Sequence, residues 1–521
     1  MLKARLLPLA AALALAGCGG SSTLSLPHRS APLVSIFEAG PQLLSDPAGT
    51  LDTMRSLGVD VVKVFLPWGS IAPDPTATSA PAGFNGADPA AYPAVNWAPY
   101  DAIVRDARAR GIAVDLTLAE PPPQWAQGSG APRKAGPQWE PSDALFGQFA
   151  RAVGTRYSGH YTPAGASGPL PRVHLWSIWN EPNYGPNLKP QAIDHWRVPV
   201  SPALYRGLVN AAWRALHATG HGRDTILIGE LAPRGIQKAE GMVPLRFVRG
   251  LYCLSSSLRP LRGAAATAVE CPATASGSST FKADNPALFE AGGFSAHPYP
   301  QGDAAPGYVT PGEPDYADFA SLPKLIATLD AAQRAYGSSH RFEIWSTEFG
   351  YNTNPPREYE ASPAVASGLI NWSEYLSWRN PRIRSYDQYQ LLDPPTTPSG
   401  SEFDTGLEFS NGRPKAVYAA FRMPIWLPHA SFASGQAIEV WGCVRPARPV
   451  GLSTHTVQYA RIQFARAGNS RFATVSTVKL TDPYGYFDVA QKFPASGRVR
   501  LEWAYPHGAK IYSRVVSVVA R

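Results

Sequence analysis

The chain has 521 residues, which is too long for one small domain and predicts two or three. Hydrophobic residues make up 44% of it and charged residues 17%, so the composition permits a large packed core and excludes a globally disordered protein. The formal net charge is +8, but the basic residues are scattered without a long run, so we expect no nucleic-acid partner.

The first thirty residues have the pattern of a targeting segment. Lys3 and Arg5 precede an apolar run over residues 6–15 that is too short to span a membrane as a mature helix. Leu15-Ala16-Gly17-Cys18 then resembles a bacterial lipoprotein box, which implies a signal peptide over 1–17, a lipid on the Cys18 sulfur and export to the cell envelope. Residues 18–30 would be a flexible tether to the membrane. The alternative is an ordinary secretory signal with an incidental cysteine, which would give a secreted protein.

Alternating strands and helices follow up to about residue 425. Besides two stretches treated below, we predict strands over 33–37, 61–66, 112–118, 225–229, 293–297 and 383–389, and helices over 46–57, 97–110, 142–157, 202–219, 317–336 and 363–379. A long excursion over 232–291 interrupts the alternation. Eight such units favour a closed parallel barrel, since an open doubly wound sheet would need a glycine-rich phosphate loop that we do not find.

Two short apolar stretches each deliver a glutamate at the end of a strand. The first runs from Val173 through Trp179 to Asn180-Glu181-Pro182, and the proline ends it. The second, beginning at Phe342, reaches Thr347-Glu348-Phe349-Gly350. Two carboxylates facing one cleft from two strand ends are what cleavage of a glycosidic bond requires.

The Asn180-Glu181-Pro182 and Thr347-Glu348-Phe349-Gly350 signatures resemble those of clan A retaining glycoside hydrolases, with families 5 and 39 the nearest. The resemblance covers residues 31–425 and implies an α/β fold, a (β/α)8 TIM barrel. It also implies that Glu181 is the acid/base, that Glu348 is the nucleophile, and that His297 and Tyr299 after the sixth strand contact the sugar and the nucleophile.

The chemistry of each role is independent of the resemblance. Glu181 must give a proton to the leaving oxygen and then act as a base toward water, while Glu348 must be ionised to form a covalent glycosyl-enzyme. Asn180, a neutral amide, would donate a hydrogen bond to the sugar 2-hydroxyl. We therefore predict a retaining O-glycosidase that acts on a poly- or oligosaccharide, as a monomer and without a metal or other cofactor. The alternative is a catalytically silent sugar-binding or envelope-interaction lipoprotein on the same barrel.

Several further side chains follow barrel strands, and each has two interpretations. Trp68 and Trp125 lie in loops where their rings would be platforms for a sugar or would pack on the barrel rim. The acids that follow the first, third and fifth strands would bind hydroxyls at the cleft edge, although we favour structural pairing for them; they are Glu38, Glu120 and Glu230.

The chain departs from the family pattern at two places. Lys63 is the nearest cation where a clan A barrel often has an arginine on the second strand. After the eighth strand, where many members place a tryptophan under the sugar, this chain offers Tyr386, Tyr389 and Gln390.

The cysteines other than Cys18 allow one bridge. Cys253 and Cys271 flank a Ser/Ala/Gly-rich segment in the excursion, so we expect a disulfide that closes this loop. Cys443 would then be an unpaired, buried thiol. No histidine cluster has the spacing of a zinc site.

The pattern changes at residue 430. Short alternating runs over 438–441, 457–464, 472–480, 499–503 and 511–519, separated by turns, predict a small C-terminal β-sandwich domain over 430–521. Trp441, Trp503, Tyr484 and Tyr486 would form a sugar platform or belong to the core. We favour the core and a structural spacer.

Overall fold

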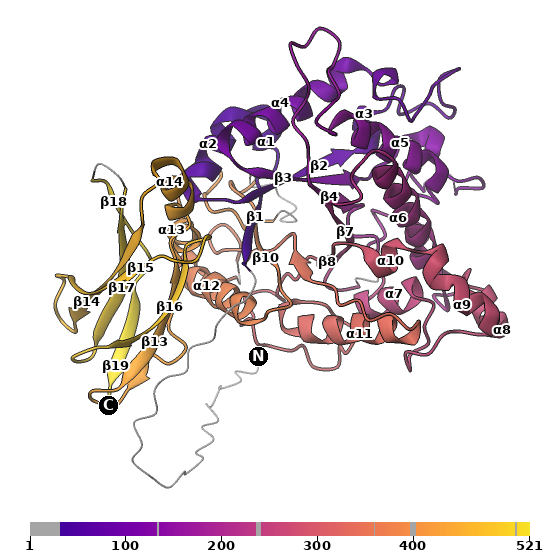
Figure 1. Ribbon diagram of the computed structural model, residues 1–521. Coiled ribbons are helices and arrows are strands. Elements are labelled where there is room, and N and C mark those ends of the chain that lie inside the picture. The colour runs from indigo at the N-terminus through magenta and orange to yellow at the C-terminus, as the bar shows by residue number, and fades with distance from the viewer. Residues whose placement is uncertain (1–31, 133–134, 236–240, 359, 396–402, 506–507) are drawn as a thin grey trace.

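The computed structural model describes residues 32–132, 135–235, 241–358, 360–395, 403–505 and 508–521 (Figure 1). The expected signal peptide, Cys18 and the tether up to residue 30 lie outside the described residues. Among the helices that the structure does describe, none is both long and apolar enough to cross a membrane.

The predicted (β/α)8 barrel is confirmed. Its strands follow one another in the order β10-β1-β2-β3-β4-β7-β8-β9, and each neighbouring pair is parallel. Backbone hydrogen bonds between Ile344 and residues 382 and 384 close the ring between β9 and β10. The strands are β1 Val34–Glu38, β2 Val61–Pro67, β3 Ala113–Ala119, β4 Leu175–Ile178, β7 Thr225–Leu231, β8 Gly293–Ala296, β9 Ile344–Ser346 and β10 Ser385–Tyr389.

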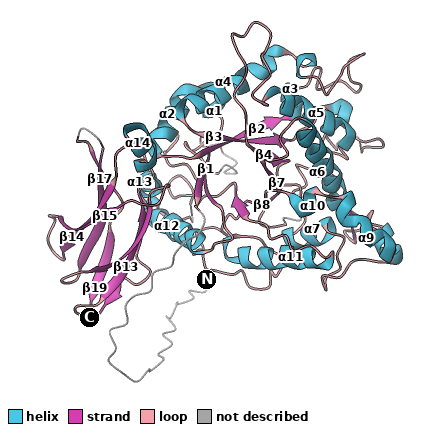
Figure 2. Cartoon of the chain, in the orientation of Figure 1, coloured by secondary structure: helices cyan, strands magenta, loops and turns pink. Residues whose placement is uncertain are grey.

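Helices surround this ring on its outside (Figure 2). The longer ones begin and end at residues with local signals: the Ser142 and Ser362 hydroxyls cap two helix N-termini, and Gly58 and Gly111 end two others in the left-handed conformation. The helices of this region are α1 Gln42–Ser45, α2 Pro47–Leu57, α3 Trp68–Ile71, α4 Ala94–Arg110, α5 Asp143–Arg156, α6 Ser201–Ala218, α11 Leu322–Ala335, α12 Pro363–Arg379 and α13 Ala416–Arg422.

The sixth barrel helix is shorter than predicted. The predicted helix over 317–336 is in fact α11, preceded by a 3-10 turn over Phe319–Ser321. The Asp318 carboxylate accepts a hydrogen bond from the Ser321 N–H, and Pro323 lies in the first turn of α11, so the α-helix begins only after this cap.

The excursion after β7 forms its own small helical layer. It contains α7 Pro244–Leu251, α8 Gly263–Thr267, α9 Ala275–Asp284 and α10 Ala287–Glu290, while a short hairpin before α6 consists of β5 Ala192–Ile193 and β6 Val198–Pro199. The structure joins Cys253 to Cys271 by a disulfide, with their Cα atoms 5.6 Å apart. Cys443 is a buried free thiol.

Inside the barrel, the side chains change from apolar to polar along the strands. Val61 and Leu175 belong to an apolar cluster in the N-terminal half of the barrel. Two residues further on, the same strands carry the fully buried Lys63 and Ser177. Because successive inward positions on a strand are two residues apart, the polar layer lies directly above the apolar one, toward the C-terminal mouth.

The predicted β-sandwich is confirmed, and it begins slightly earlier than expected, at residue 425. One sheet has the order β11-β13-β16, and the other has the order β12-β19-β17-β14-β15 with β18 paired to β17. The elements are β11 Ile425–Trp426, β12 Ser431–Phe432, β13 Ala437–Cys443, α14 Ala447–Thr454, β14 Tyr459–Arg466, β15 Ala473–Lys479, β16 Tyr486–Lys492, β17 Gly497–Ala504, β18 Lys510–Tyr512 and β19 Val516–Ala520. Of these, β11, β12, α14 and β16 were not predicted, and the predicted run over 511–519 is divided between β18 and β19.

Three of the four aromatic residues considered as a sugar platform are buried, and the fourth packs on an arginine. Trp441, Trp503 and Tyr486 are 0%, 1% and 3% exposed, and the ring of Tyr484 lies against the Arg448 guanidinium. These residues therefore offer no sugar platform.

The smaller sheet of the sandwich packs on the barrel helix α12 (Figure 1). Trp372 of α12 stacks on Trp426 of β11, and Trp441 of β13 packs against Tyr375. Beside these rings, the Arg445 guanidinium forms a fully buried ion pair with Glu374 of α12. The barrel core thus extends across the junction to Trp441, Cys443 and Tyr486 of the smaller sheet, while the sandwich keeps a second core between its two sheets.

Arg445→Met should lower the free energy of unfolding by about 3–5 kcal/mol, because the buried Glu374 carboxylate loses its ion-pair partner. Urea denaturation followed by circular dichroism measures this loss. Arg341→Met is the control, since the Arg341 side chain is 69% exposed and lies 3.7 Å from its partner Asp330, where we expect a loss below about 1 kcal/mol. Equal losses in the two variants would contradict the prediction.

Candidate functional site

Two strand ends bring Glu181 and Glu348 to the C-terminal mouth of the barrel. Glu181 follows β4 and Glu348 follows β9. Trp179 and Glu181 have φ angles of 67° and 41°, a left-handed backbone that residues other than glycine rarely adopt. The Glu181 N–H donates to the Glu230 carbonyl of the neighbouring strand, which holds this turn in place. Such local strain is frequent at functional sites.

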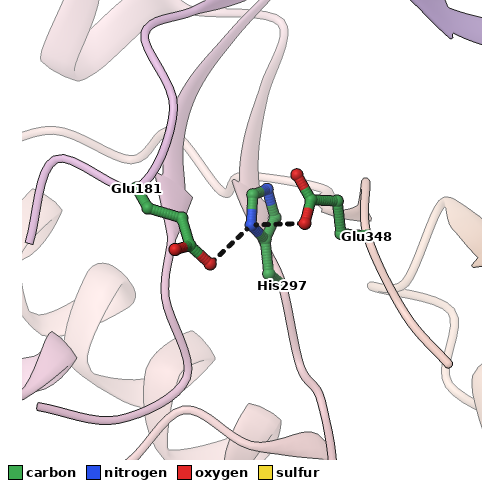
Figure 3. A group of neighbouring side chains, drawn as sticks. All are labelled: Glu181, His297 and Glu348. Carbon is green, nitrogen blue, oxygen red and sulfur yellow. Dashed lines mark hydrogen bonds and ion pairs between the residues drawn. The ribbon is translucent and has the colours of Figure 1, made fainter. Parts of the chain in front are cut away.

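The imidazole of His297, which follows β8, lies between the two carboxylates (Figure 3). Its Nδ1 atom is 3.0 Å from an oxygen of Glu181 and 3.4 Å from an oxygen of Glu348. One oxygen of each carboxylate and a ring nitrogen of His297 all lie within 4.8 Å of one another. The side chains of Glu181 and Glu348 remain 19% and 12% exposed, so both are accessible from the barrel mouth.

A buried ammonium lies beneath this group. The Nζ atom of Lys63 on β2 is 2.8 Å from Glu230 on β7 and 3.1 Å from Glu348. Glu230 also accepts hydrogen bonds from His297 Nε2 at 3.0 Å and from the Thr347 hydroxyl at 3.1 Å. The structural pairing that we favoured for Glu230 is therefore what the structure shows, and Lys63, Glu230, His297, Glu181 and Glu348 form one charge network.

The charges of this network stabilise one another. Burial opposes the charge on His297, but the surrounding carboxylates, Glu348 foremost, outweigh it and raise the His297 pKa to about 10. Burial likewise disfavours the Glu230 carboxylate, yet Lys63 and His297 hold the Glu230 pKa well below its ordinary value. Burial also opposes the charge on Lys63, and the neighbouring carboxylates, Glu230 foremost, still raise the Lys63 pKa well above that of a free lysine. His297 is thus an imidazolium at neutral pH.

Two other carboxyl groups in the barrel mouth have raised rather than lowered pKa values. Glu38 is 3.8 Å from Lys63, and burial, followed by the charge of Glu348, raises the Glu38 pKa well above its ordinary value. Burial also raises the pKa of Asp387, which accepts a hydrogen bond from the Phe349 N–H. Burial therefore disfavours the ionised form of both groups.

Tyr299 and Asn180 complete the polar lining. The Tyr299 hydroxyl donates to Glu348 at 3.3 Å, as the sequence led us to expect. The amide nitrogen of Asn180 donates to Glu120 at 3.2 Å, and the Asn180 oxygen has no hydrogen-bond partner among the described residues. Burial raises the pKa of Glu120 to about 8. Asn180 thus retains a second N–H for a ligand, while its amide oxygen is buried.

The expectation that Trp68 and Trp125 offer platforms to a sugar is wrong. Trp68 is fully buried and stacks on Phe149 of α5, with Trp125 edge-on to its ring. Trp125 is 8% exposed, lies against Phe84 as well, and donates its indole N–H to the Pro73 carbonyl. Both rings are therefore the packed interior of the barrel rim.

Glu181, His297 and Glu348 are also close enough to one another to surround a metal ion. Two observations disfavour this use. Both ring nitrogens of His297 are engaged with carboxylates, so the imidazolium has no lone pair for a metal. The Lys63 ammonium, 3.1 Å from Glu348, would also repel a second cation. The chemistry of these donors fits proton transfer and nucleophilic attack better than metal binding.

Sequence reasoning did not place Lys63 and Glu230 at the centre of the site. Lys63 is the single charged residue in the otherwise apolar strand β2, which indicates a lysine that is buried in the barrel. The sequence does not show which acid it contacts. Glu230 has a φ of 45°, and its strand shifts register against β8 near this residue, which no sequence pattern reveals.

No protein-family model matches the chain, and no curated protein does. Among solved structures, it is similar to a family 39 glycoside hydrolase from Bacteroides cellulosilyticus WH2, with 15% identity and a TM-score of 0.47 over 88% of this chain and 79% of that one. It is also similar to a β-glycosidase from Thermosphaera aggregans, with 16% identity and a TM-score of 0.45 over 76% and 96% of the two chains. For an endo-β-1,4-mannanase from Thermotoga petrophila, the identity is 11% and the TM-score 0.40 over 94% and 97%. With identities this low, the activity of the chain has to be inferred from its own site.

Glu230→Gln should lower the pKa of His297 from about 10 by at least about one unit, because it removes a carboxylate 3.0 Å away and leaves Lys63 3.4 Å from the imidazole. Glu181 and Glu348 still face the ring in this variant. Titration of histidine-labelled protein by NMR, with the His297 signal assigned from a His297→Asn spectrum, measures the change. Glu343→Gln, at a carboxylate outside the network, is the control. An unchanged His297 pKa in Glu230→Gln would contradict the network.

Proposed function

We propose that the protein is a retaining O-glycosidase that cleaves a poly- or oligosaccharide by double displacement. The observation that supports it best is the short separation of the two carboxylates, within 4.8 Å at the nearest oxygens. Retaining enzymes hold their two carboxyl groups about 5–5.5 Å apart, whereas inverting enzymes need roughly 6.5–9.5 Å to admit a water molecule.

The contacts of the two carboxylates support different roles for them. Glu348 lies 3.1 Å from the Lys63 ammonium and accepts a hydrogen bond from Tyr299, and these contacts hold its oxygens in place for attack on the anomeric carbon. Glu181 has no ammonium within 4 Å among the described residues, and its partner is the imidazolium of His297. Glu348 is therefore the nucleophile in this proposal, and Glu181 is the acid/base.

His297 links the proton transfer to the bond formation. The charge of Glu348 is the largest favourable contribution to the raised pKa of His297. When Glu348 bonds to the anomeric carbon, this charge disappears, so the imidazolium becomes a stronger acid. Its Nδ1 proton can then pass to Glu181, 3.0 Å away, as Glu181 protonates the leaving oxygen. In the second step, Glu181 removes a proton from water and returns it to His297 Nδ1, while the water oxygen attacks the anomeric carbon and the bond from this carbon to Glu348 breaks.

We further propose that Cys18 carries a lipid that attaches the protein to a membrane of the cell envelope. The lipoprotein-like Leu15-Ala16-Gly17-Cys18 sequence supports this proposal. Two or more acyl chains on the N-terminal cysteine would give stable attachment, where a single chain is marginal.

Glu348→Ala should reduce turnover of an aryl-glycoside by several powers of ten, because no covalent intermediate can form. Added azide should restore activity and give a glycosyl azide of inverted configuration, since the small anion occupies the space of the lost carboxylate. Proton NMR of the product determines the anomeric configuration.

Glu181→Ala should affect the two steps differently. An aryl-glycoside with an activated leaving group needs no proton, so the first step survives, the intermediate accumulates, and azide rescue gives a product of retained configuration. Mass spectrometry of the intact protein detects the intermediate. The opposite configurations in the two rescued variants would mean that the roles of Glu181 and Glu348 are reversed. If the wild-type protein turned over no glycoside at all, the proposed function would be refuted.

Cys18→Ser should move the protein from the membrane fraction to the soluble fraction of the exported proteins, since the lipid has no sulfur to join. Immunoblotting of fractionated cells measures the shift, and Ser21→Ala is a control change in the same segment. Unchanged fractionation of Cys18→Ser would contradict the anchor.

A further inference from the structure

The net charge of the chain is concentrated in its C-terminal domain. Residues 427–521 contain 12 lysines and arginines and 4 aspartates and glutamates, a balance of +8 that equals the formal charge of the whole chain. Residues 1–426 are therefore electrically balanced. A charge asymmetry of this size between two domains of one chain indicates that the basic domain meets an anionic partner.

The strand register gathers these cations on one face of the larger sheet. Arg461 of β14 is paired with Glu502 of β17, and Gln463 with Arg500, so these side chains share a face with Arg498. Pairing across the other two strands adds Lys479 of β15 and Lys510 and Tyr512 of β18 to the same side. We call this surface, formed by Arg461, Lys479, Arg498, Arg500, Glu502, Lys510 and Tyr512, the cationic face.

The opposite side of the same strands is apolar. Ile462, Val499 and Leu501 alternate with the charged residues and lie fully buried in the core of the sandwich. Figure 1 shows β14, β17 and β18 on the side of the domain remote from α12, so the barrel does not cover the cationic face. Its cations are open to a partner: the side chains of Arg461 and Lys510 are 45% and 50% exposed, and Arg498 and Lys479 are exposed as well.

The guanidinium groups of this face are held in fixed positions. Arg500 lies between the rings of Phe472 and Tyr512, 4.2 and 3.9 Å from their centroids, and donates to Gln463. Arg461 is bound to Glu502, the single acid of the face, which Lys510 also contacts. The face thus carries five cations and one carboxylate, an excess of four positive charges. Arginines fixed in this way lose little freedom when they bind a carboxylate through two hydrogen bonds.

A hollow of about 420 Å³ adjoins the cations on this sheet. Among the residues that line it are Arg461 and Glu502. Three neutral side chains of types able to donate and accept hydrogen bonds line it as well: Gln458, Tyr459 and Thr477. The Tyr459 side chain is 48% exposed. Neutral donors and acceptors beside arginines suit a ligand that carries both hydroxyl groups and carboxylates.

We propose that the cationic face binds an anionic polysaccharide whose sugar units carry carboxylates. A lipid bilayer fits less well, because a membrane-binding surface inserts apolar side chains and those of β14 and β17 point into the core. A single-stranded nucleic acid would stack successive bases on several free aromatic rings, but Arg500 covers the facing sides of Phe472 and Tyr512, which leaves one half-exposed ring, that of Tyr459, beside the hollow. The choice of a polysaccharide among anionic polymers rests on the proposed function of the barrel.

Affinity gel electrophoresis of the full chain tests this proposal. The Glu348→Gln background keeps bound polymer from being cleaved. We expect polygalacturonate, alginate or hyaluronate to retard the protein at low salt, and about 0.5 M NaCl to abolish the retardation by screening. For a retarding polymer, its fully methyl-esterified form should not retard the protein, because the backbone is the same and the charge is gone. No retardation by any of the three polymers would overturn the proposal.

Charge reversals locate the binding surface. Lys479→Glu with Arg498→Glu should weaken binding by at least about tenfold, and Lys479→Glu alone by a smaller factor, because both side chains belong to the cationic face. Lys492→Glu is the matched control: it makes the same charge change in the same domain, at an exposed position of β16 in the other sheet, and should change affinity less than about twofold. Melting temperatures verify that each variant is folded.

Three outcomes of these measurements would contradict the proposal. An equal loss in Lys492→Glu would mean that only the total charge matters. Equally tight binding to single-stranded DNA, or to vesicles of phosphatidylglycerol, would make the face a general surface for anions. Because binding is measured without turnover, polymer binding without any glycosidase activity would refute only the function of the barrel, and activity without polymer binding would refute only the cationic face.

Discussion

The site depends on one buried ammonium, that of Lys63. A charge without access to water is stable in a protein interior only if opposite charges and hydrogen bonds compensate for its lost hydration, and Glu230 and Glu348 do so from two other strands. Their compensation fixes the relative positions of three strand ends, and His297 adds a fourth through Glu230. The arrangement also makes the charge of Glu348 part of the local balance. Any step that neutralises this carboxylate changes the acidity of its neighbours, and in the proposed mechanism this couples bond formation to proton transfer.

The sequence was sufficient to predict the barrel and the residues at its strand ends, and it failed where distant elements decide the packing. Glu181 and Glu348 could be placed together because all strands of a parallel barrel end at one mouth. Trp68 was misplaced because the ring that covers it, Phe149, comes from a helix some eighty residues away along the chain, and loop aromatics have the same sequence pattern in either setting. The central position of Glu230 follows from a register shift, which only the folded backbone shows.

In the C-terminal domain, too, the sequence pattern predicts strands but does not show what their side chains contact. Its conspicuous aromatic residues suggested a sugar platform, but Trp503 points into the core of the sandwich, and Trp441 is buried on the other side of its own sheet, against α12. The functional signal lies in the alternate, outward positions of the same strands. Arg498 and Arg500 look like scattered basic residues in the sequence, and the antiparallel register is what places them beside Arg461. A period of two residues predicts that one face of a strand is solvated, but it does not show what the solvated face binds.

The core that α12 shares with the sandwich has a consequence for long substrates. Because Trp372, Trp426 and the Arg445–Glu374 pair leave no flexible linker between the domains, the span from the cationic face to the barrel mouth is fixed. A polymer longer than this span can occupy both places at once, and its second contact is then intramolecular, with a high effective concentration. An oligosaccharide shorter than the span cannot reach both sites, so it gains no affinity from a second contact. The rigid junction would therefore act as a length filter, so that apparent affinity rises in a step, rather than gradually, as the chain of sugars grows.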